Sequence, residues 1–141
     1  MDETPEYIEM CRKAVEIQEY WHNSSHTISE WARSYFVSPK DDSLIHYYDF
    51  ESYPQHSIGY TWLPLEGQLQ DMVIGKYNNS FSSVICVFCD WFQHEDDSNE
   101  TVTREQLWLA FVQWELYGKK WDGTHYTRPG RVVVGGMKNG N

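Results

Sequence analysis

The stretch "EQLWLAFVQWELYGKKWDG", from Glu105 to Gly123, holds three of the seven tryptophans in the chain. Every residue from 107 to 112 is apolar. A helix that is apolar all round is buried on most of its sides. This stretch therefore predicts a buried helix around which the rest of the chain is organised.

The two ends of this helix are marked in the sequence. "TREQ" is a capping-box pattern, in which the Thr103 hydroxyl accepts from the backbone N–H of Gln106 and the Gln106 side chain reaches back. Gly118 is a favourable C-terminal stop. Lys119 and Lys120 suit the negative end of the helix dipole. We therefore expect one helix from about residue 104 to residue 117.

A second helix is predicted at the N-terminus, over "TPEYIEMCRKAVEIQEYW" (residues 4–21). Thr4 can cap it and Pro5 fits its first position. Apolar residues recur at spacings of three and four and predict one buried stripe: Tyr7, Met10, Cys11, Ala14, Ile17 and Trp21. Cys11 on this stripe is interpreted as a small core residue.

Two further helices are predicted between these. Pro64 opens the first, and Gly75 is its expected stop. Its apolar face consists of Leu65, Leu69, Met72 and Val73. The second follows "NNS" and covers "FSSVICVFCDWFQ" (residues 81–93), with apolar residues at the helical period: Phe81, Val84, Ile85, Phe88 and Phe92.

Three short segments predict antiparallel strands: "ARSYFVS" (32–38), "SLIHYYDF" (43–50) and "SIGYTWLP" (57–64). The turn "PKDD" (39–42) joins the first two as a hairpin, whereas residues 27–33 could instead form a short helical turn. "THYT" (124–127) and "RVVV" (131–134) are candidate edge strands. The predicted fold is α+β, with about four helices packed on one face of a small antiparallel sheet. We expect a single domain over residues 1–130, then a C-terminal strand and loose tail over 131–141.

Composition narrows the possible functions. The 141 residues suit one domain, and 21 Asp and Glu against 11 Lys and Arg give a net charge of −10. Without a basic stripe, such a chain repels phosphate backbones, so direct nucleic-acid binding is not expected. Three cysteines do not suit a secreted disulfide scaffold. The acidic N-terminus does not resemble a signal peptide, and no apolar run suits a membrane span. We therefore expect a cytoplasmic protein.

The sequence carries few signs of catalysis. The Cys86-x-x-Cys89 pair lies within a predicted helix, so two buried structural cysteines are favoured over a redox dithiol. His22 and His26 could complete a zinc set with this pair, but in an order unlike the usual finger. No hydrolase, zinc-protease, P-loop or dinucleotide-binding motif is present. The sequence favours a non-enzyme without metal or cofactor.

Aromatic residues are abundant near the predicted strands: Trp31, Tyr35, Tyr47, Tyr48, Tyr53, Tyr60 and Trp62. One interpretation, which we favour, is that one sheet face packs under the helices, because buried strands prefer such residues. The other is a face covered with rings that stacks sugars or bases, or docks a protein.

"YTWLPLEGQLQDMV" (60–73) and "REQLWLAFVQWELYGKKWDG" (104–123) resemble a family of small uncharacterised proteins encoded by bacteriophages and prophages of Gram-positive bacteria. Its members pair W-L-P…Q-L-Q-x-M with E-Q-L-W-L-A-F-V…Y-G-K-x-W-x-G. "YIEMCRKAVEIQ" resembles their N-terminal helix, so the resemblance covers roughly residues 5–21 and 60–123. The tail "RVVVGGMKNGN" departs from the family pattern. The resemblance implies a phage or prophage accessory protein in the bacterial host cytoplasm, with no activity attached.

Within the matching segments, five residues fit a core face: Leu69, Met72, Leu107, Phe111 and Trp114. Six others fit it less well and are our candidate binding residues: Trp62, Gln68, Gln106, Trp108, Lys120 and Trp121. Acidity, surplus aromatics and missing catalytic motifs favour a non-catalytic module that binds a host or phage protein. The alternatives are an acidic DNA mimic that inhibits a host nuclease, and an enzyme with an unfamiliar site for a nucleotide or sugar. The sequence sets neither the partner nor the oligomeric state.

Overall fold

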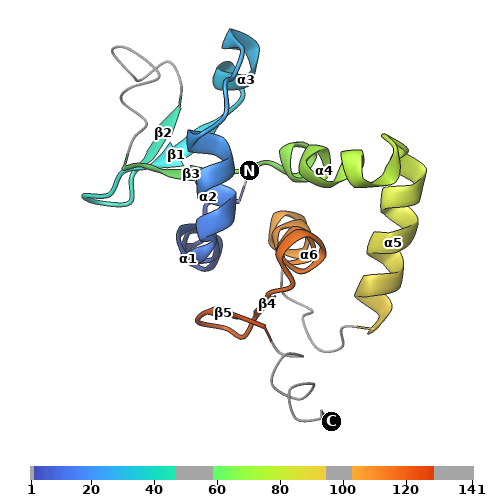
Figure 1. Cartoon of the computed structure of the whole chain (residues 1–141). Helices are drawn as coiled ribbons and strands as arrows, with labels where there is room; N and C mark the ends of the chain where they lie inside the picture. The colour runs from blue at the N-terminus through green and yellow to red at the C-terminus, as the bar shows by residue number, and fades with distance from the viewer. Residues whose placement is uncertain (1, 47–58, 95–102, 129–141) are drawn as a thin grey trace.

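The computed structural model describes residues 2–46, 59–94 and 103–128. Within these ranges the chain forms a small α+β domain with an antiparallel sheet, which confirms the predicted class (Figure 1). The helices are α1 (Pro5–Lys13), α2 (Val15–His22), α3 (Ile28–Ala32), α4 (Glu66–Ile74), the 3-10 helix η3 (Gly75–Tyr77), α5 (Phe81–His94) and α6 (Arg104–Tyr117). The strands are β1 (Tyr35–Val37), β2 (Leu44–His46), β3 (Thr61–Leu63), β4 (Lys120–Trp121) and β5 (Tyr126–Thr127).

The N-terminal segment forms two helices, so the prediction of one continuous helix was wrong. The chain turns at Ala14, whose φ of −86° and ψ of 76° are not helical. The Ala14 N–H donates to the Cys11 carbonyl at 3.1 Å, and the Gln18 side chain donates to the same oxygen at 3.1 Å. The predicted stripe is nevertheless buried throughout, because α1 and α2 both turn it toward the core.

The three-stranded sheet has the order β2-β1-β3, with antiparallel pairing on both sides of β1. The "PKDD" turn joins β1 to β2 as predicted: Ser38 and Ser43 pair at its base, and Asp42 adopts a positive φ of 58°. Residues 47–58, part of two predicted strands, lie outside the described residues. The alternative of a helical turn near residue 30 is confirmed by α3, where Thr27 and Glu30 form a capping box.

The outer edge of β3 is closed by side chains from the N-terminal helices. Because Trp62 stands opposite Phe36 with its backbone groups turned away from β1, those groups need other partners. The Gln18 side chain supplies both, since its oxygen accepts from the Trp62 N–H at 2.7 Å and its nitrogen donates to the Trp62 carbonyl at 2.9 Å.

The neighbouring outward carbonyls of this edge are also satisfied. The Tyr7 hydroxyl donates to the Pro64 carbonyl at 2.7 Å, and His22 Nε2 donates to the Tyr60 carbonyl at 3.1 Å. Burial lowers the pKa of His22, which favours the neutral ring that donates from one nitrogen. Side chains of α1 and α2 thus occupy the place of a further strand.

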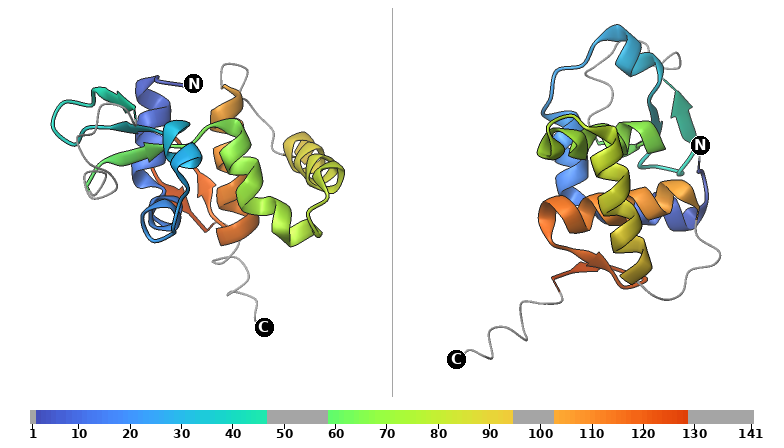
Figure 2. Two further views of the ribbon diagram at one scale, coloured as in Figure 1. Left: turned by 90° about the horizontal axis from the view of Figure 1, so that it is seen from above. Right: turned by 90° about the vertical axis from the view of Figure 1, so that its right-hand side faces the viewer.

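Helices α4 and α6 run side by side in the same direction. Ion pairs join them at both ends, Glu66 to Arg104 at 3.2 Å and Lys76 to Glu115 at 2.8 Å. The hydroxyl of Tyr77 also donates to Glu115; burial and then this carboxylate raise the pKa of Tyr77 to about 12. Figure 2 shows α5 as the outermost element, crossing α4 and α6.

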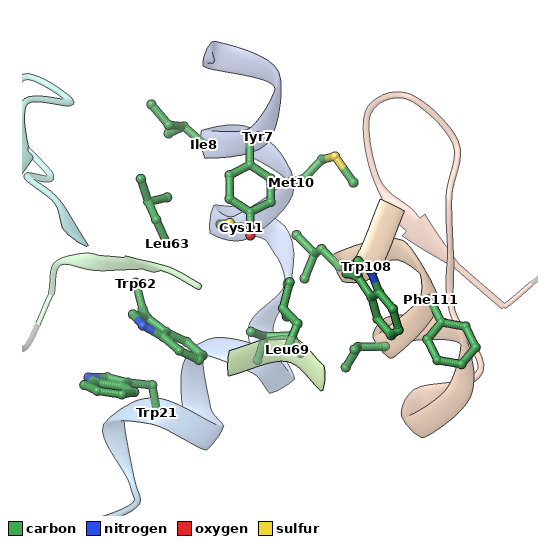
Figure 3. Close-up of a cluster of buried hydrophobic side chains, with 14 of the residues drawn as sticks. Tyr7, Ile8, Met10, Cys11, Trp21, Trp62, Leu63, Leu69, Trp108 and Phe111 are labelled. Atoms are coloured by element: carbon green, nitrogen blue, oxygen red, sulfur yellow. The ribbon is translucent and has the colours of Figure 1, made fainter. Parts of the chain in front are cut away.

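The core extends from the sheet to α6. Figure 3 shows it running from Trp21 and Trp62, through Leu69 of α4, to Trp108 and Phe111 of α6. The expected core positions Leu69 and Phe111 are fully buried, and Met72 and Leu107 are partly buried. Trp114 was wrongly expected in the core: 41% of its surface is exposed.

Two helix ends match the expectation only in part. Helix α4 ends at Ile74 with Gly75 as its C-cap, as predicted, but Gly75 keeps a right-handed helical conformation and the chain continues into η3, after which Asn78 and Asn79 carry positive φ angles. At the start of α6, Thr103 accepts from the Gln106 N–H as predicted. The Gln106 side chain, however, points elsewhere, toward Asp2.

Asp2 ties the N-terminal segment to the start of α6. Its carboxylate accepts from the Thr4 N–H at 2.9 Å, from the Gln106 side chain at 3.1 Å and from the Thr103 hydroxyl. Burial raises the pKa of Asp2, but these hydrogen bonds outweigh burial and leave the pKa below its usual value. The ionised carboxylate therefore stabilises the fold.

After α6 the chain forms a small hairpin. The turn follows Trp121, with Gly123 at a φ of 106° and the Asp122 N–H donating to the His125 carbonyl. Tyr126 and Thr127 of the predicted "THYT" strand pair with β4. The predicted "RVVV" strand and the tail over 131–141 lie outside the described residues.

We expect Gln18→Ala to lower the free energy of unfolding by about 1–3 kcal/mol, because it removes the partners that Gln18 supplies to the N–H and the carbonyl of Trp62. Urea unfolding at neutral pH measures this change. Gln70→Ala is the matched control, since Gln70 makes one 3.4 Å bond to a neighbouring side chain; its effect should stay within about 0.5 kcal/mol. Equal effects of the two substitutions would contradict the role assigned to Gln18.

We expect Asp2→Asn to flatten the acid branch of the stability curve. A carboxyl whose pKa is lower in the folded state contributes stability that is present above its unfolded pKa of about 3.9 and is lost as pH falls through the folded value. Urea unfolding of wild type and variant between pH 5 and pH 2 measures the slopes. Asp71→Asn, at an exposed carboxyl, is the control. Parallel curves for wild type and Asp2→Asn would refute the assignment.

Candidate functional site

A groove of about 320 Å³ lies between α5 and the N-terminal halves of α4 and α6. Its volume falls at the small end of the range for ligand-binding clefts. Its walls are formed by Glu66 and Gln70 of α4, by Phe81, Ile85, Phe88 and Cys89 of α5, and by Arg104, Leu107 and Trp108 of α6. Most of these side chains are apolar, and the Glu66–Arg104 ion pair marks one rim.

Helix α5 leaves much of its apolar surface uncovered. Only Val84 is fully buried, whereas Phe81 and Phe92 are 50% and 48% exposed. Both rings belong to the same apolar stripe as Ile85 and Phe88, which are half-buried. The predicted helical period is therefore confirmed, but the core does not cover all of these apolar residues. Phe81, Ile85 and Phe88 line the groove instead.

The cysteine pair of α5 is also on the surface. Cys86 and Cys89 are both free and exposed, so the prediction of two buried structural cysteines was wrong. Helix α5 contacts α4 and α6 through a narrower face than its number of apolar residues suggests, and the two cysteines lie outside that face. Cys89 lines the groove, whereas Cys86 does not.

Trp108 forms the floor of the groove. It was expected to be less core-like, but it is 3% exposed, because the Phe88 ring stacks on it with centroids 4.0 Å apart and planes 6° apart. Phe111 meets both rings edge-on. This rigid aromatic cluster fixes α5 on α6 and holds the half-exposed stripe at a defined position.

Trp62 and Gln68 lie together at a different place. Trp62 is 1% exposed and stacks on Trp21 at 4.8 Å, so it belongs to the core. Gln68 accepts from the Leu65 N–H and donates to Ser34, a capping role. Both line a cavity of about 50 Å³, far below the volume of ordinary ligand pockets.

The other three candidates are scattered. Gln106 is buried, and its side chain donates to Asp2 and Thr4. Trp121 of β4 donates from its indole N–H to Glu6 at 3.1 Å and packs on Tyr126. Lys120 is exposed on the same strand. The structure thus brings Trp62 and Gln68 together, places Trp108 in the groove, and does not assemble the six into one site.

The possible zinc set is not assembled either. Within the described residues, no three His, Cys, Asp or Glu side chains gather at metal-binding distance. His22 and His26 instead bond backbone carbonyls near α2, while the cysteines lie on α5, beyond α4 and α6 (Figure 1). Of the aromatic residues near the strands, Trp31 and Trp62 are buried, as the core interpretation predicts. Tyr47, Tyr48 and Tyr53 lie outside the described residues.

The residues of the groove that sequence reasoning missed are Phe81, Ile85, Phe88 and Cys89. Phe92 lies on the same stripe of α5, outside the lining of the groove. One signal in the sequence could have found them. Between residues 81 and 94 the chain has one carboxylate, Asp90, and neither Lys nor Arg. The surface helices α1 and α2 carry several charges. A helix with almost no charge, such as α5, is either covered by protein on both faces or exposes one apolar face to solvent.

None of the described helices has both the length and the apolar character needed to cross a membrane. Comparisons with protein-family models, with curated proteins and with solved structures found no match to this chain. The resemblance to the phage and prophage family therefore stays a prediction that rests on its quoted motifs.

Proposed function

We propose that this chain is a non-catalytic protein-binding module that receives a helix of another protein chain in the groove beside α5. The observation that carries the proposal is the uncovered apolar stripe of α5, with Phe81 and Phe92 half exposed, next to a groove of about 320 Å³. Apolar surface left open on a folded domain marks an interaction site.

The shape of the groove supports a helical occupant. Its apolar residues lie at helical spacing along one wall, and the stacked Phe88 and Trp108 rings form a firm floor. Helix-in-groove recognition uses this pattern, in which side chains spaced three and four residues apart enter an apolar cleft. The aromatic residues supply large contact areas at small entropic cost.

The proposal also includes the cell compartment and the biological source in which the protein acts. The motif resemblance favours a phage or prophage accessory protein in the cytoplasm of a bacterial host, acting on a host or phage protein. The packing of about four helices on one face of the sheet stays a prediction, since the contacts of α1 and α2 with β3 lie at the outer edge of the sheet. The DNA-mimic and unfamiliar-enzyme alternatives stay predictions.

A paired substitution tests the docking function. Wild type, the double variant Phe81→Asp/Phe92→Asp, and the control Val15→Asp are immobilised and exposed to lysates of Gram-positive cells, uninfected and phage-infected. Val15 is a matched control because it is 54% exposed and lies on α2, away from the groove. We expect a protein that wild type and control retain and the double variant loses, because the new carboxylates must be desolvated on docking.

The retained protein is then purified and titrated against the three chains by calorimetry. We expect at least about tenfold weaker binding by the double variant, equal to about 1.4 kcal/mol. Binding that is equal for all three chains would remove the support for docking at this groove. A chain that neither retains a protein through Phe81 and Phe92 nor pairs with its own copies through them would do the same.

A further inference from the structure

We infer that a second copy of this chain supplies the helix that fills the groove, so that two α5 helices pack antiparallel about a twofold axis. The inference rests on the proposed function, that the groove docks a helix, and names the occupant. It comes from the order of residues along the α5 stripe, from the sparse charge of this helix, and from the size of the open surface.

The spacing of the stripe residues is the same in both directions along α5. Phe81, Ile85, Phe88 and Phe92 are separated by four, three and four residues. This is the spacing of a coiled-coil seam. In an antiparallel pair centred between residues 86 and 87, Phe81 stands opposite Phe92 of the other copy, and Ile85 stands opposite Phe88. A twofold interface requires this reciprocity, in which one residue meets a second and the second meets the first.

Charge restricts where a second copy can approach. Each chain carries a net charge of −10, so two copies repel over most of their surfaces. On α5 the charged side chain at pH 7 is Asp90, which is exposed. Asp90 lies on the side of α5 opposite the stripe, so no carboxylate of α5 enters the seam. A basic partner would gain little here, since the stripe offers it no anion.

The length of α5 limits the buried area, and therefore the affinity, of the dimer. Its 14 residues span about 21 Å. Two such helices, with the half-buried Leu107 beside them, form a small interface, at or below the low end for specific association of about 1,200 Å². We therefore expect a dissociation constant of roughly micromolar size, and a monomer in dilute solution.

The two surface cysteines report on the pairing. Cys89 lines the groove and lies beside the seam, whereas Cys86 is exposed on α5 outside the groove. Pairing should therefore shield Cys89 from an alkylating reagent and leave Cys86 reactive. The two thiols sit on the same helix, three residues apart, so Cys86 is an internal control for the stability of that helix.

The experiment measures mass by light scattering from about 1 to 500 µM, with reductant present, together with iodoacetamide labelling of each cysteine. We expect the mass to rise from 16.8 kDa toward twice that value, and Cys89 labelling to slow several-fold while Cys86 labelling does not. The single variants Phe81→Lys and Phe92→Glu should each weaken dimerisation at least tenfold. Val15→Lys, outside the groove, should not.

The combination of both substitutions in one chain tests the register. In the antiparallel pair each new ammonium group stands opposite a new carboxylate of the other copy, so the double variant should dimerise more strongly than either single variant. Circular dichroism and urea unfolding establish that each variant is folded. Dimerisation that both single variants leave intact, or a double variant no better than the single ones, would overturn the proposal.

A mass of one chain at every concentration would also overturn it. In that case, a foreign protein retained through Phe81 and Phe92 would leave the docking function standing with another occupant. A monomer that also retains no such protein would remove both the inference and the proposed function.

Discussion

The backbone of β3 must find hydrogen-bond partners on the side that faces away from β1, and this requirement organises the N-terminal half of the fold. Gln18 meets it by presenting an amide, which has the donor and acceptor of a peptide group, to Trp62. Tyr7 and His22 satisfy the outward carbonyls on either side. Buried polar groups of the backbone are costly when unpaired, so α1 and α2 cannot move from β3 without a large loss of stability.

The same requirement explains the break at Ala14. A continuous helix would use the Cys11 carbonyl in its own ladder, as the acceptor for the N–H four residues later. In the structure Gln18 donates to this carbonyl and to the carbonyl of Trp62 from one nitrogen. Hydropathy predicts the buried stripe across both helices, because burial depends on spacing alone. It does not predict the break, which depends on a contact between residues 18 and 62.

The candidate site shows a similar division between what the sequence can and cannot predict. The period of α5 was recognised, and so were the helix and its approximate ends. Which apolar residues would be covered depends on how α5 crosses α4 and α6, a matter of tertiary packing. Trp108 was expected to fit the core less well, but it is buried because Phe88 covers its ring, and the open surface lies on the neighbouring helix.

Because side chains of α1 and α2 close the β3 edge, that strand does not offer its backbone for pairing with another chain. Recognition is shifted to a helix face, where side chains rather than backbone hydrogen bonds decide the partner. On such a face, a high net charge and an uncharged stripe act together. The charge on the rest of the chain opposes unspecific association, and the stripe is the place where close approach costs least. Specificity then follows from the order of apolar residues along α5, since a partner must match the positions of Phe81 and Phe92 to cover both.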